Sequence, residues 1–459
     1  MSDTPGAAAR RTPPSGRAQL ARRPGPGRWR PRSAAVLAAV ALTAALAACS
    51  SSSSGSHSTL TFADVAPFSG PDAALGPIYL VSCDGTTNAI NKAGGILGHQ
   101  VKCTTADTRG EPADAVPAVG NLIQNTGNLA LVIGCTSDEA ASVVPVINKN
   151  KTVMFCMTGQ SEFDHVKYPY FYRLVPPDLA ESYAMTVIAQ KLGYKKIALA
   201  FGNDIGSQTF VQPAIAAIAK AGLTMVANET LDLHATTFRT EAAKIVAAHP
   251  DAIMTEALGN ADPTLLAEIK QLNGGKMIPV IGTSAAISPV FYSACAKAVG
   301  ASDFAANFHA DNLVTATSGP AYEAFTRALL AVKGHVSGAQ TGDFATYFTA
   351  PGAVHLYDGM NLAALAMVAA GSPDTAKWKP WIAKIGDGTP GAVVVNSFAA
   401  GVAALKSGKK IRYVGPGGPT SFDAFHDSPG IFQIDTYSTT GKVMVSGSIT
   451  TAEIRAVSP

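Results

Sequence analysis

Two predicted strands end in segments that are rich in hydroxyl side chains. These segments are "IGCTSD" (residues 133–138) and "FCMTGQ" (residues 155–160). In open parallel sheets, ligands bind beyond the carboxyl ends of the strands. The helix N-termini that follow such strands offer N–H groups and a positive dipole, which suit a carboxylate. Ser137 and Thr158 could therefore hold a ligand, or they could only cap the helices; taken alone, the residue types favour capping.

No motif for catalysis or metal binding stands out. The sequence has no GxSxG elbow, no CxxC, and no HxH or HExxH pair among its nine histidines. A GxGxxG stretch at residues 386–391 follows a predicted helix rather than a strand, so it fails the structural context of a dinucleotide site. We expect no enzyme activity, no cofactor and no metal. An anchored hydrolase stays open as the alternative from another class, because catalytic triads are assembled in space.

The first 57 residues are typical of an exported lipoprotein. Residues 1–33 carry eight arginines and one acid, and residues 34–48 form an uncharged run that is too short to span a membrane. "LAAC" at residues 46–49 resembles the bacterial lipobox, in which the cysteine is lipidated. We expect a signal peptide at 1–48, lipidation at Cys49, a serine-rich linker at 49–57, and a chain anchored on the extracellular face of the cell membrane.

Removal of residues 1–48 would leave a net charge of −4, so the basic balance of the whole chain belongs to the signal. Nothing in the remainder suggests binding to nucleic acid. About 410 residues are too many for one hydrophobic core and fit two domains.

Five cysteines follow Cys49, in a compartment that permits disulfides. Cys83 lies on a predicted helix and Cys103 in the next strand, while Cys135 and Cys156 each end one of two successive strands. We predict the pairs 83–103 and 135–156, with buried free thiols as the alternative. An odd number leaves at least one cysteine unpaired, and Cys295 is the candidate.

Short apolar strands alternate with amphipathic helices along most of the chain, and the pattern restarts after "YFYRLVPPD" (residues 170–178). Apolar runs of four to eight residues between helices are typical of buried parallel strands. The second half is richer in helices and ends in a predicted strand pair. The pattern predicts an α/β protein with two doubly wound units.

Five segments in this order resemble the leucine/isoleucine/valine-type extracellular solute-binding proteins, also called type I periplasmic binding proteins. The segments are "PFSGPDAALG", "INKAGGILGHQV", "FRTEAAKIVAAHPDAIM", "HLYDGMNLAALAMVAAGS" and "GPTSFDAFHDSPGIFQIDTY". The resemblance implies two α/β lobes joined by three hinge crossings, closing on a small solute that is passed to an ATP-binding-cassette (ABC) permease. It implies hinges near Val175, Phe308 and Tyr413, and a monomer. The expected ranges are 58–175 and 308–412 for lobe 1, and 176–307 and 413–459 for lobe 2.

The resemblance also implies ligand contacts. In the family, hydroxyl groups at the positions of Ser137 (with Thr136 as the alternative) and Thr158 hold the ligand's carboxylate. The second lobe departs from the family pattern, because Ile205 replaces a common tyrosine and Leu258 a common aromatic residue.

Two further departures concern the ligand's charge and shape. Leu75 stands where an aromatic residue is frequent, and Thr283 and Ser284 stand where an acid often meets the ligand's ammonium group. Asp204 or Glu256 could replace that acid. An unpaired buried charge is costly, so the missing acid predicts a pocket that prefers an amide, a urea-like or a carboxylic compound over an amino acid.

The sequence thus predicts a lipid-anchored substrate-binding component of an ABC importer for a branched-chain amino acid or a related small solute. A ligand-sensing lipoprotein that signals to a membrane partner is the main alternative, since its binding site would look the same.

Overall fold

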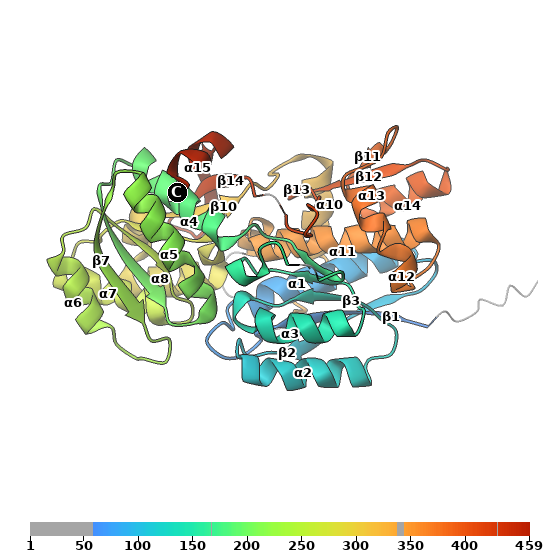
Figure 1. Cartoon of the computed structure of the whole chain (residues 1–459), viewed down its shortest axis with the longest axis horizontal. Coiled ribbons are helices and arrows are strands. Elements are labelled where there is room, and N and C mark those ends of the chain that lie inside the picture. Colours follow the sequence, from blue (N-terminus) through green and yellow to red (C-terminus); the bar gives the residue numbers. More distant parts are fainter. Residues whose placement is uncertain (1–57, 167, 337–343, 429) are drawn as a thin grey trace, which may run out of the picture. The chain divides into compact units, whose positions relative to one another are not determined.

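The computed structural model describes residues 58–459 except residues 167, 337–343 and 429. Cys49 and the expected signal peptide and linker lie outside the described residues. Within these ranges the chain forms two large sheets and one small sheet, with helices packed on the large sheets (Figure 1). The predicted α/β class is confirmed.

The first sheet contains five parallel strands in the order β2-β1-β3-β4-β5. Its strands are β1 (Leu60–Ala66), β2 (Val101–Asp107), β3 (Leu129–Gly134), β4 (Met154–Cys156) and β5 (Phe171–Arg173). All seven residues of β1 are buried, as expected for a parallel strand covered on both faces. Because side chains alternate along a strand, Phe62 enters one hydrophobic core and Ala63 and Val65 enter another.

Helices cover both faces of this sheet. The core that contains Ala63 is closed by α2 (Pro112–Asn125) and α3 (Ser137–Lys149), and the core that contains Phe62 by α1 (Gly76–Lys92), α10 (Gly319–Leu330) and α11 (Pro351–Ala370). Helix α11 is long and apolar enough to cross a membrane, but 78% of its most apolar window is buried inside the protein. A helix that is apolar all round is expected in such a core.

The second sheet contains seven strands in the order β15-β14-β10-β9-β8-β6-β7. Its parallel strands are β6 (Lys196–Gly202), β7 (Thr224–Leu231), β8 (Ala252–Glu256), β9 (Val280–Gly282) and β10 (Phe308–Leu313). The predicted late strand pair is confirmed as β14 (Phe432–Tyr437), which pairs antiparallel with β10, and β15 (Val443–Ile449), which pairs antiparallel with β14.

Helices cover this sheet as well. They are α4 (Asp178–Lys191), α5 (Ile205–Lys220), α6 (Arg239–Ala247), α7 (Ala261–Leu272), α8 (Pro289–Val299), α9 (Ala301–Asn307) and α15 (Thr451–Val457). A small sheet, β11 (Val393–Val395), β12 (Ile411–Gly415) and β13 (Gly418–Pro419), lies with α12 (Thr375–Trp378), α13 (Trp381–Gly386) and α14 (Phe398–Lys406) in the part of the chain between β10 and β14. Three 3₁₀ turns complete the described elements, namely η1 (Ser161–Phe163), η2 (Ser284–Ala286) and η3 (Phe344–Phe348).

The chain passes three times between the part built on the first sheet and the part built on the second sheet: after β5, after β10, and between β12 and β14. The second crossing was expected near Phe308, but Phe308 begins β10, which pairs with β9 and β14 in the second sheet. That crossing therefore follows Leu313. The residue ranges of the lobes otherwise stay a prediction.

Both predicted disulfides are present, and they hold different parts of the first sheet. Cys83 of α1 bonds Cys103 of β2, and Cys135, directly after β3, bonds Cys156 at the end of β4. Cys295 is free and buried, as predicted. The second disulfide joins the two strand ends that carry the predicted hydroxyl side chains.

Candidate functional site

A cavity of about 100 Å³ lies at the carboxyl ends of strands from both large sheets. Its walls come from the segments that follow β1, β3, β4, β5, β6, β8 and β9 and from the start of α11. This is where open parallel sheets place their ligands. The cavity is lined by Asp72, Leu75, Ile78, Tyr79, Thr136, Ser137, Asp138, Met157, Val175, Asp178, Glu181, Asp204, Gly206, Phe210, Glu256, Leu258, Ser284, Ala285, Ile287, Pro351 and Gly352.

The predicted hydroxyl groups lie at the turn between β3 and α3. Thr136 caps α3, its hydroxyl group donating to Glu139, and it also lines the cavity. Ser137 lines the cavity, and its hydroxyl oxygen is 3.2 Å from that of Thr158. Thr158 itself is buried behind Ser137 and is not among the lining residues. Thr158 therefore supports Ser137 from behind the cavity wall, and a direct contact between Thr158 and the ligand stays a prediction.

The other predicted residues divide into lining and non-lining positions. Leu75 and Leu258 contribute apolar surface to the cavity, and Ser284 lines it as well. Asp204 lines it and caps α5, accepting from the backbone N–H of Ser207 at 2.7 Å. Ile205 does not line it; its side chain is 45% exposed and lies on a neighbouring groove.

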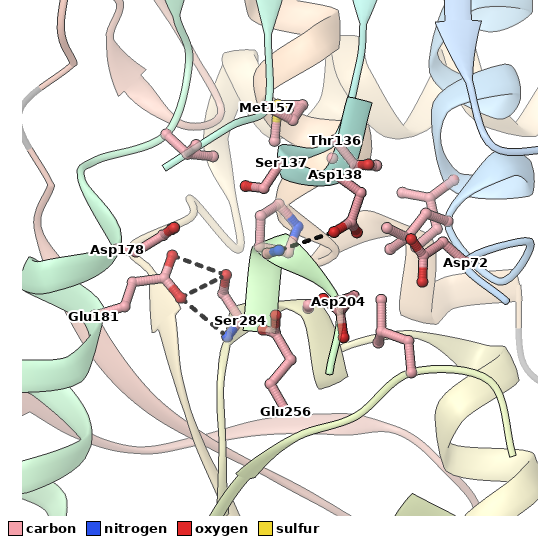
Figure 2. Close-up of a pocket in the computed structure, with 18 of the residues that line it drawn as sticks. Asp72, Thr136, Ser137, Asp138, Met157, Asp178, Glu181, Asp204, Glu256 and Ser284 are labelled. Atoms are coloured by element: carbon pink, nitrogen blue, oxygen red, sulfur yellow. Dashed lines mark hydrogen bonds between the residues drawn. The ribbon is translucent and has the colours of Figure 1, made fainter. Parts of the chain in front are cut away.

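Carboxyl groups dominate the polar lining. Six acids line the cavity, and none of the described lining residues is a lysine, arginine or histidine. They are Asp72, Asp138, Asp178, Glu181, Asp204 and Glu256. Asp204 and Glu256, the two residues that the sequence offered as replacements for the missing acid, both line the cavity. An ammonium group would meet acids here from several directions (Figure 2).

The family often has an acid at the position of Ser284, and in this chain helix α4 supplies a carboxyl group there instead. Glu181, in the first turns of α4, accepts from the Ser284 hydroxyl group with both carboxyl oxygens at 3.1 Å. Glu256 lies nearby and accepts from the hydroxyl group of Thr283. Thr283 and Ser284 thus each position a carboxyl group, that of Glu256 and that of Glu181.

Asp138 connects the two sheets' helices across the cavity. Its Oδ1 accepts from the backbone N–H of Gly206, in the first turn of α5, at 2.8 Å. Asp138 itself lies in the first turn of α3. The side chain therefore occupies part of the anion-binding N-terminus of α5 that a ligand carboxylate could otherwise use.

Burial raises the pKa of five of the lining acids, namely Asp72, Asp138, Asp178, Glu181 and Glu256, because desolvation disfavours a charged carboxylate. Desolvation raises the pKa of Asp138 to about 6, that of Glu181 to about 7 and that of Asp178 to about 8. Desolvation and the neighbouring Asp138 raise the pKa of Asp72 well above its usual value. Some of these carboxyl groups therefore hold protons near neutral pH, and a cation bound beside them would displace those protons.

Asp72, Asp138, Asp178 and Glu181 were not identified from the sequence as site residues. Three of them lie in the first turns of α3 and α4, where acids are common because they favour the helix dipole. The available signal was their position, since a first-turn acid after a strand's carboxyl end lies beside the ligand site. That position alone does not separate a ligand contact from a dipole contact.

Two α/β units that contribute strand ends to one cavity define a protein that encloses a small solute. Residues 59–429 match the periplasmic binding protein family, and the chain belongs to it. Two curated relatives match in part. A Leu/Ile/Val-binding protein homolog of Brucella melitensis is 26% identical over 174 residues, 37% of this chain and 47% of the relative. The Leu/Ile/Val-binding protein BraC3 of Rhizobium johnstonii is 33% identical over 105 residues, 23% and 28% of the two chains.

The fold is also that of solved structures of this class. The branched-chain amino acid transporter substrate binding protein LivJ of Streptococcus pneumoniae, solved with isoleucine, superposes with a TM-score of 0.67 at 20% identity. The match covers 85% of this chain and 99% of that protein. The predicted resemblance and the two-lobe class are confirmed, and members of this family bind solutes. The curated relatives are matched over less than half of their length, so the solute and the partners of this chain are matters for proposal.

Proposed function

We propose that the chain is the lipid-anchored, extracellular solute-binding component of an ABC importer. It captures a small solute in the cavity between the two α/β units and presents it to the membrane permease. The family and the position of the cavity support the binding role. The lipobox-like "LAAC" and the serine-rich segment after it support the anchor.

The acidic lining carries the proposal for the ligand. Six carboxyl groups and no basic side chain among the described lining residues favour a solute with an ammonium group. A branched-chain amino acid belongs to this class, with its ammonium group near Glu181 and its carboxylate near Ser137 and the N-terminus of α3. Amides and urea-like compounds fit less well, and a carboxylic acid without an ammonium group least, because nothing offsets its charge.

A thermal-shift screen of the purified chain tests this function. The panel contains aliphatic amino acids, linear amines, short amides, ureas and small carboxylic acids. A ligand at 100 times its dissociation constant stabilises the folded state by about 2.7 kcal/mol. We expect stabilisation by compounds with an ammonium group. Stabilisation by carboxylic acids alone would refute the proposed ligand class, and no stabilisation by any compound would count against the binding function.

A ligand-sensing lipoprotein would use the same cavity and remains the second candidate. Affinity capture from solubilised membranes distinguishes the two, since recovery of a permease supports transport and recovery of a membrane kinase supports sensing. The hydrolase alternative receives no support from the cavity, because its described lining contains no histidine, cysteine or lysine to activate a nucleophile.

A further inference from the structure

Five of the six lining carboxyl groups lie toward one of two sides of the cavity, and Glu256 lies between them, acting electrostatically on Asp204, Asp178 and Glu181. Figure 2 shows Asp178 and Glu181 on one side and Asp72 on the opposite side. Asp72 lies with Asp138 and Asp204, and these three carboxyl groups act on one another electrostatically. Glu181 lies with Asp311, on β10 behind the cavity wall. Carboxyl groups are therefore available at both ends of the cavity.

Each end contains a pair of carboxyl groups that act on one another electrostatically. The pairs are Asp72 with Asp138 and Glu181 with Asp311. Asp311 is fully buried, and neither of its oxygens accepts a hydrogen bond from an N–H or O–H group of the described residues. Two adjacent carboxylates cannot both ionise without a counter-charge. Each pair must therefore hold a proton or lie next to a cation.

Unused acceptors at the cavity point to a ligand that donates hydrogen bonds. Asp72 is only 3% exposed and lines the cavity, yet its Oδ1 has no hydrogen-bond partner among the described residues. Oδ2 of Asp204 is likewise buried without a partner in this part of the chain. A buried acceptor without a donor is unfavourable. An ammonium group, with three donors and no acceptor, satisfies such oxygens.

A metal ion fits this arrangement poorly. Among the described residues, ligand atoms of three potential metal-binding side chains converge only at Asp64, Cys83 and Cys103. That cluster lies outside the cavity lining, and its two cysteines are joined in a disulfide. The cavity acids do not converge on one point in this way. Apolar side chains also line the cavity, including Leu75, Ile78, Met157 and Leu258, and these suit an aliphatic chain rather than a hydrated ion.

We propose that the solute is a small organic dication, a short aliphatic diamine or a close analogue. One ammonium group binds beside Asp72 and Asp138, and the other beside Glu181, with the alkyl chain along the apolar lining. This inference rests on the proposed solute-binding function and narrows its ligand class. It accounts for two carboxyl pairs where a single ammonium group would leave one pair without a counter-charge.

Isothermal titration calorimetry on the purified full chain tests the proposal with a series of linear α,ω-diaminoalkanes of three to six carbons. The matched probes are 1-aminobutane and leucine, each with one ammonium group. We expect one chain length to bind at least tenfold more tightly than 1-aminobutane and leucine, because hydrogen bonds to charged groups are strong. The preferred length reports the separation of the two acidic ends.

Two variants locate the two ammonium groups. Asp72→Asn and Glu181→Gln should each weaken binding of the best diamine at least tenfold, toward the affinity of the monoamine. Asp303→Asn is the matched control, since Asp303 is 51% exposed and pairs with Lys270 away from the cavity; it should leave the affinity unchanged. The length series in the unaltered protein gives an answer even if a variant does not fold.

The failures of the two proposals are distinguishable. If leucine or 1-aminobutane binds as tightly as the best diamine, or if no diamine binds, the dication is refuted while the solute-binding function stands on the compound that does bind. If no compound of any class binds, the proposed function fails together with it.

Discussion

Removal of the Cys135–Cys156 disulfide should weaken both the fold and the ligand site. The bond joins the ends of β3 and β4. Cys135 directly precedes Thr136 and Ser137, and Cys156 lies two residues before Thr158. The hydroxyl oxygens of Ser137 and Thr158 are 3.2 Å apart, so their separation depends on how these two strand ends are held.

The size of the stability loss follows from the length of the closed loop. The two cysteines are 21 residues apart, and a loop of this length corresponds to about 3 kcal/mol of unfolded-state entropy at 25 °C. An unfolding entropy of about 2 cal/mol/K per residue over roughly 400 residues converts this loss to about 4 °C in the melting temperature. Scanning calorimetry of a Cys135→Ala/Cys156→Ala variant measures it directly.

The chain contains a matched control for this experiment. Cys83 and Cys103 are 20 residues apart and do not line the cavity, so a Cys83→Ala/Cys103→Ala variant should lose nearly the same stability. Only the 135–156 variant should also bind the solute more weakly. Titration calorimetry measures this affinity at a temperature well below the melting temperatures of both variants. Equal loss of affinity in both variants, or unchanged affinity in the 135–156 variant, would show that this disulfide does not position the hydroxyl groups.

Three further changes have defined outcomes. Thr158→Ala should weaken solute binding about fivefold, since the loss of one hydrogen bond to Ser137 costs about 1 kcal/mol, whereas Thr158→Ser should bind like the unaltered protein. The melting temperature of the ligand-free protein should fall as the pH rises from 5 to 8. The folded-state pKa values of Glu181 and Asp178 are raised to about 7 and about 8, so the unfolded chain loses these protons at a lower pH than the folded protein does. A melting temperature that rises between pH 5 and pH 8 would contradict these shifts. Intact-mass measurement of the membrane-bound protein should find residues 1–48 removed and Cys49 acylated, and an unmodified Cys49 would refute the anchor.

Local patterns were sufficient to predict most of the fold. Strands such as β3 and β6 are almost entirely apolar runs between helices, and such runs are typical of buried parallel strands whatever their neighbours. The second disulfide was predictable because successive parallel strands are often neighbours in the sheet. Cys135 and Cys156 follow or end successive strands, and β3 and β4 are adjacent, with Gly134 opposite Cys156.

Sheet membership was less accessible from the sequence. Phe308 was expected at a crossing into the first lobe, yet it begins β10, which lies between β9 and β14 of the second sheet. The periodicity of a short apolar segment predicts a strand but contains no information about its partners. The boundary could therefore be placed only to within the length of that strand.

The charge of the site was the least accessible from the sequence, and the reason is physical. An aligned position shows which residue type stands at 284, but a pocket's electrostatic potential depends on every group that reaches it in space. Serine at 284 lacks a charge, and its hydroxyl group holds both carboxyl oxygens of Glu181, which comes from a helix more than 90 residues earlier in the chain.

The absence of an acid at position 284 therefore does not predict a ligand without an ammonium group. Glu181 restores the charge that an acid at that position would have provided, and Asp72 with Asp138 adds a second carboxyl pair across the cavity. One ammonium group can neutralise only one of these pairs, and the other would have to retain its proton in the complex. A ligand with two positive groups removes that requirement, so the excess of carboxyl groups favours a dication over an amino acid.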